Sequence, residues 1–249
     1  MTSASSEQDT IAEMPHALEI LYLCRDYVII YKPYGVMSED SNGKSDSCPA
    51  MIREYLDGDG KTTDVYCVHR LDCTTAGVMV YALNKKAAAI LSDEAARGLF
   101  HKTYAAFVTA DSGLSESGEM RDFLFFDRRA GKSFVCKEGK RAAKEALLRY
   151  RKLSDFMYDG VCVSKFEVKP ETGRTHQIRA QFGARNSPLV GDGKYGSRIN
   201  LKGPSLFSVE LSFIWGNKTV TYNAPPRFLT CSDSVSPLTD RIQNGANQN

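Results

Sequence analysis

The chain has 249 residues, of which 42% are hydrophobic and 25% charged, and its formal net charge at pH 7 is +2. This composition is ordinary for a globular protein, and the length suffices to bury a hydrophobic core in one large domain or two small ones. No segment approaches the roughly 18 consecutive apolar residues of a membrane-spanning helix. We therefore expect a protein that does not cross a membrane.

Both ends of the chain are polar and lack apolar periodicity. Residues 1–15 and 232–249 are rich in Ser, Asn, Gln and Asp, which predicts a disordered leader and tail around one domain of residues 16–231. The first fifteen residues contain no Lys or Arg. They lack the basic start of a secretory signal and the Arg-rich face of a transit peptide. A cytoplasmic protein is expected.

Seven cysteines are present, and none of them form a C-x-x-C pair. Cys67 and Cys73 lie closest together with His69 between them, a pattern that also suggests a metal ligand cluster. Zinc sites normally use four ligands at recognisable spacings, and no second cluster supplies the rest. Free thiols in a reducing compartment, and no metal site, are therefore predicted.

In chain order, the elements are mostly short strands. Two strands are expected within residues 18–31, separated at Arg25-Asp26. Further strands are expected at residues 76–83, 100–109, 122–126, 133–137, 143–153, 161–169, 206–214 and 219–222. Helices are expected at residues 48–56, between Asn84 as N-cap and Gly98 as terminator, and at 175–185 with Thr175 as cap.

Strands joined by short turns outnumber the helices, and the helices do not alternate regularly with them. This pattern favours an α+β fold with a mainly antiparallel sheet over a doubly wound fold with a parallel sheet.

One acidic residue lies at a sharp break between two apolar segments, in the run His69-Arg70-Leu71-Asp72. An Asp in such a place is often a turn former, because its side chain can bond its own backbone. Two further runs make a functional role for Asp72 more plausible, Lys102-Thr103-Tyr104 and Gly173-Arg174-Thr175-His176-Gln177-Ile178-Arg179.

Together with Lys32-Pro33-Tyr34-Gly35, these runs and their order resemble the RluA-type RNA pseudouridine synthases over roughly residues 18–226. The resemblance implies the pseudouridine synthase fold, a bent mixed sheet with flanking helices and a central catalytic cleft. It implies isomerisation of specific uridines in structured ribosomal or transfer RNA to pseudouridine, with base flipping. The reaction involves no redox change, so no cofactor is expected. We expect a monomer that binds RNA but neither DNA nor a membrane.

The resemblance also assigns roles to individual residues. Asp72 is the catalytic carboxylate, acting as a nucleophile or as a base. Tyr104 stacks on the target base and assists loss of its carbon 5 proton, and Arg70 fills the space that the flipped base leaves. Because burial disfavours the charged form of a carboxylate, a cationic partner is needed for Asp72. The resemblance identifies Arg179 as that partner, and Arg174 is the other candidate.

The remaining substrate-binding or RNA-binding candidates are His69, Lys102, Arg174, His176, Gln177 and Lys194. Among them, His69 is expected to support the turn rather than to act as an acid or base. Lys194 belongs to the glycine-rich run of residues 191–196, which lacks the G-K-[ST] ending of a phosphate loop. A tight loop is expected there, although the resembled family has a similar G-D-x-K-Y-G run.

The chain departs from the family pattern at two places. Residues 73–77, Cys-Thr-Thr-Ala-Gly, stand where many members have a charged residue and then Asp-Thr-Ser-Gly. Fewer than twenty residues precede Leu18, so the small RNA-binding domain that many members carry in front is not expected. RNA affinity would then come from the catalytic domain. Residues 128–152 contain ten Lys or Arg and two acidic residues, and this basic stretch is the candidate surface.

Two other function classes fit parts of the sequence. A non-catalytic RNA-binding protein on the same fold would tolerate the substitution Asp72→Asn without loss of its biological effect. A carboxylate-based glycosidase would need two acidic groups at a fixed separation, and only Asp72 is embedded in a motif.

Overall fold

The computed structural model describes residues 18–40, 47–57, 63–110, 113–158 and 160–227. The disordered leader and tail predicted for residues 1–15 and 232–249 lie outside these ranges. Among the described residues, no helix is long and apolar enough to cross a membrane.

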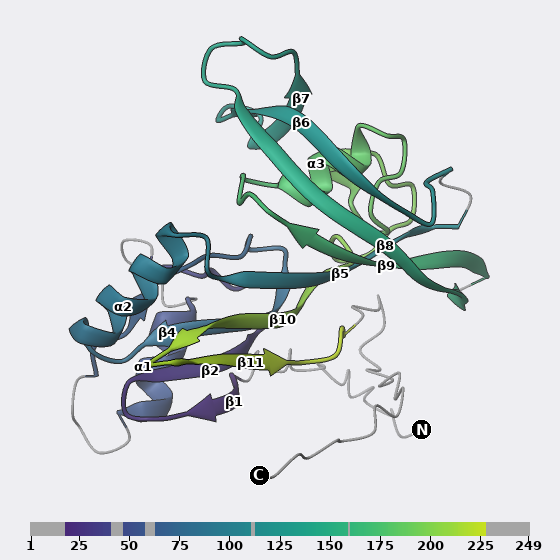
Figure 1. The fold of residues 1–249 in the computed structure, drawn as a ribbon. Coiled ribbons are helices and arrows are strands. Elements are labelled where there is room, and N and C mark those ends of the chain that lie inside the picture. Colours follow the sequence, from purple (N-terminus) through teal and green to yellow (C-terminus); the bar gives the residue numbers. More distant parts are fainter. Residues whose placement is uncertain (1–17, 41–46, 58–62, 111–112, 159, 228–249) are drawn as a thin grey trace, which may run out of the picture.

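Eleven strands form one sheet in the described part of the chain, in the hydrogen-bonded order β1-β2-β4-β10-β5-β9-β8-β6-β7, with β11 paired to β10 and β3 to β4 (Figure 1). The pairing of β4 with β10 is parallel and the other pairings are antiparallel. The mixed, mainly antiparallel α+β prediction is therefore confirmed. The strands are β1 Glu19–Leu23, β2 Tyr27–Lys32, β3 Tyr66–Cys67, β4 Ala76–Ala82, β5 His101–Thr109, β6 Ser117–Asp127, β7 Lys132–Cys136, β8 Lys144–Tyr158, β9 Val161–Pro170, β10 Leu206–Trp215 and β11 Lys218–Asn223.

The helices are α1 Cys48–Leu56, α2 Lys85–Ala96 and α3 Gln177–Gly183, with a 3-10 turn η1 at Gly193–Tyr195. Asn84 caps α2 as predicted, because its side-chain oxygen accepts a hydrogen bond from the Ala87 backbone N–H at 2.9 Å. The predicted Thr175 cap of α3 is wrong. The residue before α3 is His176, which has a left-handed φ of 53° and makes no side-chain capping bond. The Thr175 carbonyl instead accepts a hydrogen bond from Ser133 of β7.

The core lies on both faces of the central strands, and the fully buried β2 and β4 divide their side chains between the two faces. On one face, Ile30 and Met79 belong to a cluster with residues of α1 and α3. On the other face, Ile29 and Val80 belong to a cluster that includes Leu91 of α2. Two helices therefore cover one face and α2 covers the other, which fixes the loops that enter and leave β4.

Gly77 explains how the chain leaves the His69–Asp72 loop and enters β4. Its φ is 126°, and a Cβ atom there would lie 2.1 Å from the Ser208 carbonyl oxygen of β10. Because only glycine permits both the backbone conformation and the close approach, β4 can pair with β10 beside the loop. The close strand contact holds the loop that carries Asp72.

Candidate active site

A cleft with a volume of about 1110 Å³ brings together the three sequence motifs. Its walls come from the 69–75 loop, from the start of β5, and from the segment between β9 and α3. The predicted site residues that line it are His69, Arg70, Asp72, Lys102, Tyr104, Arg174, His176, Gln177 and Arg179. Segments separated by a hundred residues in the sequence thus form one site.

The Asp72 loop is held by its backbone. The Asp72 carbonyl accepts a hydrogen bond from the Thr75 N–H at 2.9 Å, and the Leu71 carbonyl accepts one from the Ser38 hydroxyl at 2.8 Å. The carboxylate itself is 28% exposed in the cleft, and its nearest ionisable nitrogen is His176 Nε2 at 4.0 Å. This arrangement leaves the carboxylate oxygens accessible from the cleft.

Lys32, the first residue of the Lys32-Pro33-Tyr34-Gly35 run, supports the same loop and was not predicted as a site residue. Its side chain is fully buried, and its ammonium donates hydrogen bonds to the carbonyls of Pro33 at 2.9 Å and Cys73 at 3.2 Å. Burial lowers the pKa of Lys32 to about 8. The ammonium therefore holds the carbonyl of Cys73, the residue that directly follows Asp72.

Arg179 does not form the predicted ion pair with Asp72. Its Nε and Nη2 donate to the two carboxylate oxygens of Asp192 at 2.7 and 2.8 Å, and its guanidinium lies 5.1 Å from the centre of the Tyr195 ring. Asp192 is 1% exposed, so this carboxylate needs a hydrogen-bonded cation more than the partly exposed Asp72 does. Burial acts to lower the pKa of Arg179, but Asp192 outweighs it and the pKa is raised.

Arg179 reaches the Asp72 loop through Thr74. Its remaining nitrogen, Nη1, donates to the Thr74 hydroxyl at 3.1 Å, two residues after Asp72. Thr74 occupies the position at which the family pattern has an acidic residue. Among the described residues, the guanidinium therefore has one hydrogen-bonded carboxylate partner, Asp192, and a neutral contact to the Asp72 loop.

Tyr104 lies in β5 at the floor of the cleft and is 8% exposed. Burial, together with the nearby negative charge of Asp72, raises the pKa of the phenol above its ordinary value. Tyr104 is therefore protonated at neutral pH and offers its ring face and a hydroxyl donor rather than a phenolate.

His176 faces Asp72 from the opposite wall. Its Nδ1 lies 3.1 Å from the Tyr195 hydroxyl, and its ring packs edge-on against Phe126 of β6. Burial lowers the pKa of His176 below its ordinary value, although the Asp72 charge acts in the opposite direction. A neutral imidazole is therefore expected beside the carboxylate at pH 7.

His69 and Lys102 lie next to each other, with different environments. The His69 ring is buried against Phe100, and its Nε2 accepts a hydrogen bond from the Val80 backbone N–H at 3.1 Å. Burial, with a smaller effect of Lys102, lowers its pKa well below the ordinary value, consistent with support of the turn. Lys102 lines the cleft without a carboxylate partner among the described residues, and burial lowers its pKa to about 8.

Arg70 points along the rim of the cleft. It forms an ion pair with Glu39 at 2.9 Å, and both side chains are at least half exposed. Exposed pairs of this kind contribute roughly 0–1 kcal/mol, so Arg70 can leave Glu39 at little cost.

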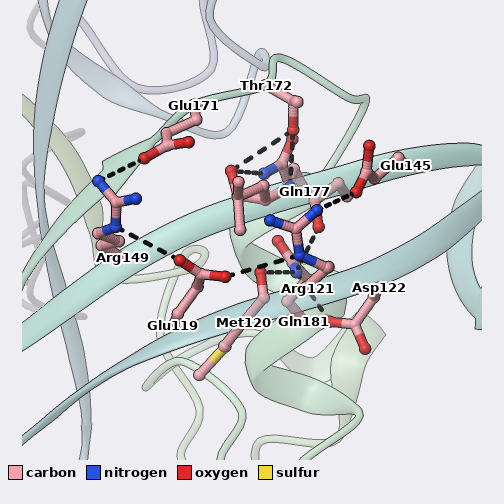
Figure 2. Close-up of polar contacts among 12 residues, drawn as sticks. Glu119, Met120, Arg121, Asp122, Glu145, Arg149, Glu171, Thr172, Gln177 and Gln181 are labelled. Atoms are coloured by element: carbon pink, nitrogen blue, oxygen red, sulfur yellow. Dashed lines mark hydrogen bonds and ion pairs between the residues drawn. The ribbon is translucent and has the colours of Figure 1, made fainter.

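Gln177 lines the cleft and holds the loop between β9 and α3, and its predicted RNA contact stays a prediction. Its amide oxygen accepts from the Arg174 backbone N–H at 3.0 Å and from Thr172, and its amide nitrogen donates to the Leu147 carbonyl at 3.0 Å (Figure 2). These bonds use its polar atoms inside the protein. Arg174 donates from Nε to the Glu145 carbonyl at 2.7 Å, which leaves its two terminal nitrogens without a partner among the described residues.

Lys194 is not among the residues that line the cleft, and its predicted substrate contact stays a prediction. Its ammonium donates to the Gly131 carbonyl at 3.0 Å, in the turn between β6 and β7. The neighbouring Asp192 and Tyr195 are the members of this glycine-rich run that reach the site, through Arg179 and His176. The sequence shows residues 191–196 as a glycine-rich run, but no feature of that run indicates that the Asp192 carboxylate is buried in the folded protein.

Comparisons with known proteins show what the chain is similar to. Residues 26–184 match the model of the RNA pseudouridylate synthase family. An uncharacterized RNA pseudouridine synthase of Haemophilus influenzae is 26% identical over 213 residues, which cover 84% of this chain and 88% of the relative. The tRNA pseudouridine synthase C of Haemophilus ducreyi is 31% identical over 192 residues, with 72% and 74% covered.

Some relatives are considerably longer than the matched region. The match covers 59% of the ribosomal large subunit pseudouridine synthase D of Borreliella burgdorferi. Among solved structures, human RNA pseudouridylate synthase domain containing 1 superposes with a TM-score of 0.68 at 26% identity, over 84% of this chain and 83% of that one.

Proposed function

Because the chain belongs to the RNA pseudouridylate synthase family, we propose that its cleft converts specific uridines of structured ribosomal or transfer RNA to pseudouridine, with Asp72 as the catalytic residue. The observation that carries this proposal is the grouping of Asp72 with protonated Tyr104, neutral His176 and Arg179 in one cleft. No cofactor is required, because the reaction rearranges bonds without a change in oxidation state.

The isomerisation breaks the bond between N1 of the base and C1′ of the ribose. The base turns, C5 bonds to C1′, the C5 proton leaves and N1 gains a proton. Asp72 takes part in its ionised form, either by attacking the sugar or by removing a proton from it. The position of its exposed oxygens in the cleft supports both routes equally.

The surrounding residues act on the base and on the RNA backbone. Tyr104 stacks on the base and assists loss of the C5 proton, and its buried position in β5 supports this role. Arg70 leaves Glu39 and fills the gap in the helical stack when the uridine is flipped out. Lys102 and Arg174 contact phosphate, because each carries cationic nitrogens without a carboxylate partner among the described residues.

The proposal is tested with RNA labelled with tritium at C5 of uridine, because each isomerisation releases that hydrogen to water. Ribosomal and transfer RNA are labelled and incubated separately with the protein. The names of the two relatives support trying both classes, one acting on tRNA and the other on the large ribosomal subunit. Release from at least one class is expected, and release from neither would refute the proposed activity.

The charge of Lys102 predicts a pH dependence of RNA binding. With a pKa of about 8, its ammonium is charged below pH 8 and neutral above it. The KM for RNA should therefore rise as the pH goes from 7 to 9, by about tenfold if one charged contact is lost. In Lys102→Met the KM should be high at both pH values, and in Lys102→Arg it should stay low. Steady-state kinetics checks this, and an equal pH response in wild type and Lys102→Met would contradict it.

The bond from Arg179 to Thr74 predicts a positioning role for the Thr74 hydroxyl. Thr74→Val keeps the shape of the side chain but removes the acceptor of the Nη1 bond. The kcat should fall about five- to tenfold with little change in KM, because one hydrogen bond that positions the Asp72 loop is lost. Thr74→Ser should restore kcat. A Val variant as active as wild type would show that the contact does not position the loop.

A further inference from the structure

The basic stretch of residues 128–152 divides into two parts in the structure. In its second part, Arg149, Arg151 and Lys152 form ion pairs with Glu171, Glu167 and Asp155. Figure 2 shows Arg149 between Glu119 and Glu171 in this network. The charges of these two arginines and this lysine are already neutralised by carboxylates. They are therefore a poor source of the positive charge that attracts a polyanion.

The first part is the hairpin tip, which we define as Phe125–Lys144, the end of β6, all of β7 and the start of β8. It contains seven Lys or Arg residues and two acidic residues. Within the described residues, none of the seven cationic side chains forms an ion pair with a carboxylate. Six are exposed and the seventh, Lys132, lies over aromatic rings; the exposed ones are Arg128, Arg129, Lys137, Lys140, Arg141 and Lys144. The positive charge of this tip is therefore uncompensated.

The two faces of the hairpin tip differ. Phe126 and Ser133 are cross-strand partners on the face toward the active site, where Phe126 packs on His176 and Ser133 bonds to the Thr175 carbonyl. Phe125 and Phe134 are partners on the opposite face. Phe134 is 41% exposed. The inner face thus contacts the wall of the cleft, although Phe126 remains 39% exposed, while the outer face presents the Phe134 ring to solvent.

The cations and rings of the outer face are interleaved. The Lys140 ammonium lies 4.1 Å from the centre of the Phe125 ring. The Lys132 ammonium lies 5.4 Å from the Phe134 ring, but it is closer to the Tyr195 ring, at 4.6 Å, and donates to the Lys194 carbonyl. In Figure 1 the tip projects at the end of the sheet opposite β1, and β7 is the edge strand there. A stacking surface bordered by lysines suits unpaired nucleotides, whose bases stack on rings while phosphates meet cations.

We propose that the outer face of the hairpin tip binds single-stranded RNA that flanks the target uridine, with one base stacked on Phe134 and phosphates held by Lys137, Lys140 and Arg141. The inference rests on the proposed RNA substrate and extends it. It adds that the RNA must have unpaired nucleotides next to the target, not only a flipped base. The hairpin tip would then supply RNA affinity from the same domain that carries the cleft.

The test measures binding of a fluorescein-labelled oligouridylate by fluorescence anisotropy, so that it does not depend on turnover. Phe134→Ala should raise the Kd about tenfold. The matched control is Val135→Ala, which removes an apolar side chain of similar exposure (38%) from the other face of the same strand and should leave the Kd unchanged. Equal Kd values for wild type and Phe134→Ala would overturn the stacking role.

The charge contribution is tested with the triple variant Lys137→Ser, Lys140→Ser, Arg141→Ser. The slope of log Kd against log salt concentration should fall by about 0.7 for each lost phosphate contact, up to about 2 in all. The control removes three equally exposed lysines elsewhere, Lys85, Lys86 and Lys218. A slope equal in wild type and hairpin variant, or lowered as much by the control, would overturn the proposal.

Kinetics separates this inference from the proposed function. If wild type forms pseudouridine and Phe134→Ala raises KM for tRNA or rRNA without changing kcat, both stand. If wild type forms pseudouridine and the hairpin variants share its KM and its Kd, the hairpin inference alone fails. If wild type forms none, the proposed function fails, and the anisotropy result still decides whether the hairpin tip binds RNA.

Discussion

Asp72→Asn should lower kcat by about a thousandfold or more while the affinity for RNA is retained. The substitution keeps the size of the side chain but removes the charge that either route requires, attack on the sugar or removal of its proton. The carboxylate makes no strong hydrogen bond within the described residues. The Asp72 carbonyl accepts from the Thr75 N–H, and Lys32 holds the carbonyl of the next residue, Cys73. The loop should therefore keep its conformation. Single-turnover kinetics with tritiated RNA, beside anisotropy with unlabelled competitor, separates catalysis from binding.

The matched control for this loss is Asp40→Asn, at another carboxylate that lines the cleft. Asp40 is bound to Arg53 and Ser47 rather than facing the motifs. Asp40→Asn should cost little activity. Normal turnover by Asp72→Asn would contradict the catalytic assignment and would favour the alternative of an RNA-binding protein in which this string has no chemical role.

Arg179→Met should lower the free energy of unfolding by about 3–5 kcal/mol, because it leaves the buried carboxylate of Asp192 without its cation. Both side chains of the pair are less than 5% exposed, at 4% and 1%. In the double variant Arg179→Met, Asp192→Asn, much of the lost stability should return, since no charge remains buried. Denaturant unfolding of wild type, both single variants and the double variant measures this coupling.

A different outcome would support Asp72, the partner of Arg179 that was predicted from the sequence. If Asp192→Asn leaves stability unchanged and Arg179→Met affects only turnover, then Arg179 serves Asp72 directly. Activity should fall in Arg179→Met in either case, because the bond to Thr74 is lost as well. Only the unfolding data distinguish the two carboxylates.

The fold followed from sequence signals that act locally. Asn84 and Gly98 bound α2 as predicted, since capping depends on residues within one turn of the helix. Apolar segments bounded by turn residues predicted the strands β2 and β4, but they did not predict the order of the strands in the sheet. The parallel contact of β4 with β10 depends on Gly77 and Ser208, which are 131 residues apart. No local pattern specifies that pairing.

The site was predictable where a motif carries its own chemistry. The strings around Asp72, Tyr104 and Arg179 enter one cleft, as expected. What failed was the choice of partners. Arg179 binds Asp192 because burial decides which carboxylate most needs a cation, and burial is a property of the packed structure. Packing also decides the contacts of Gln177, whose amide bonds to the Leu147 carbonyl and the Arg174 backbone N–H, and its predicted RNA contact stays a prediction.

The basic stretch shows the same limit for surface charge. Ten cations in residues 128–152 predicted an RNA surface, yet Arg149 and Arg151 lie opposite glutamates that come from other strands. Cross-strand neighbours decide which charges are free. Within this basic stretch, the cations of the hairpin tip are the ones that have no carboxylate partner among the described residues.

The most direct test of the central claim maps pseudouridine in natural RNA. Pooled tRNA and rRNA from cells that lack this gene are incubated with wild type or with Asp72→Ala, and pseudouridines are located by carbodiimide-blocked reverse transcription. A stop that appears with wild type and not with the variant is the predicted result, and its position identifies the substrate. Absence of new stops with wild-type protein, while RNA binding is intact, would contradict the assignment of the cleft as a pseudouridine synthase active site.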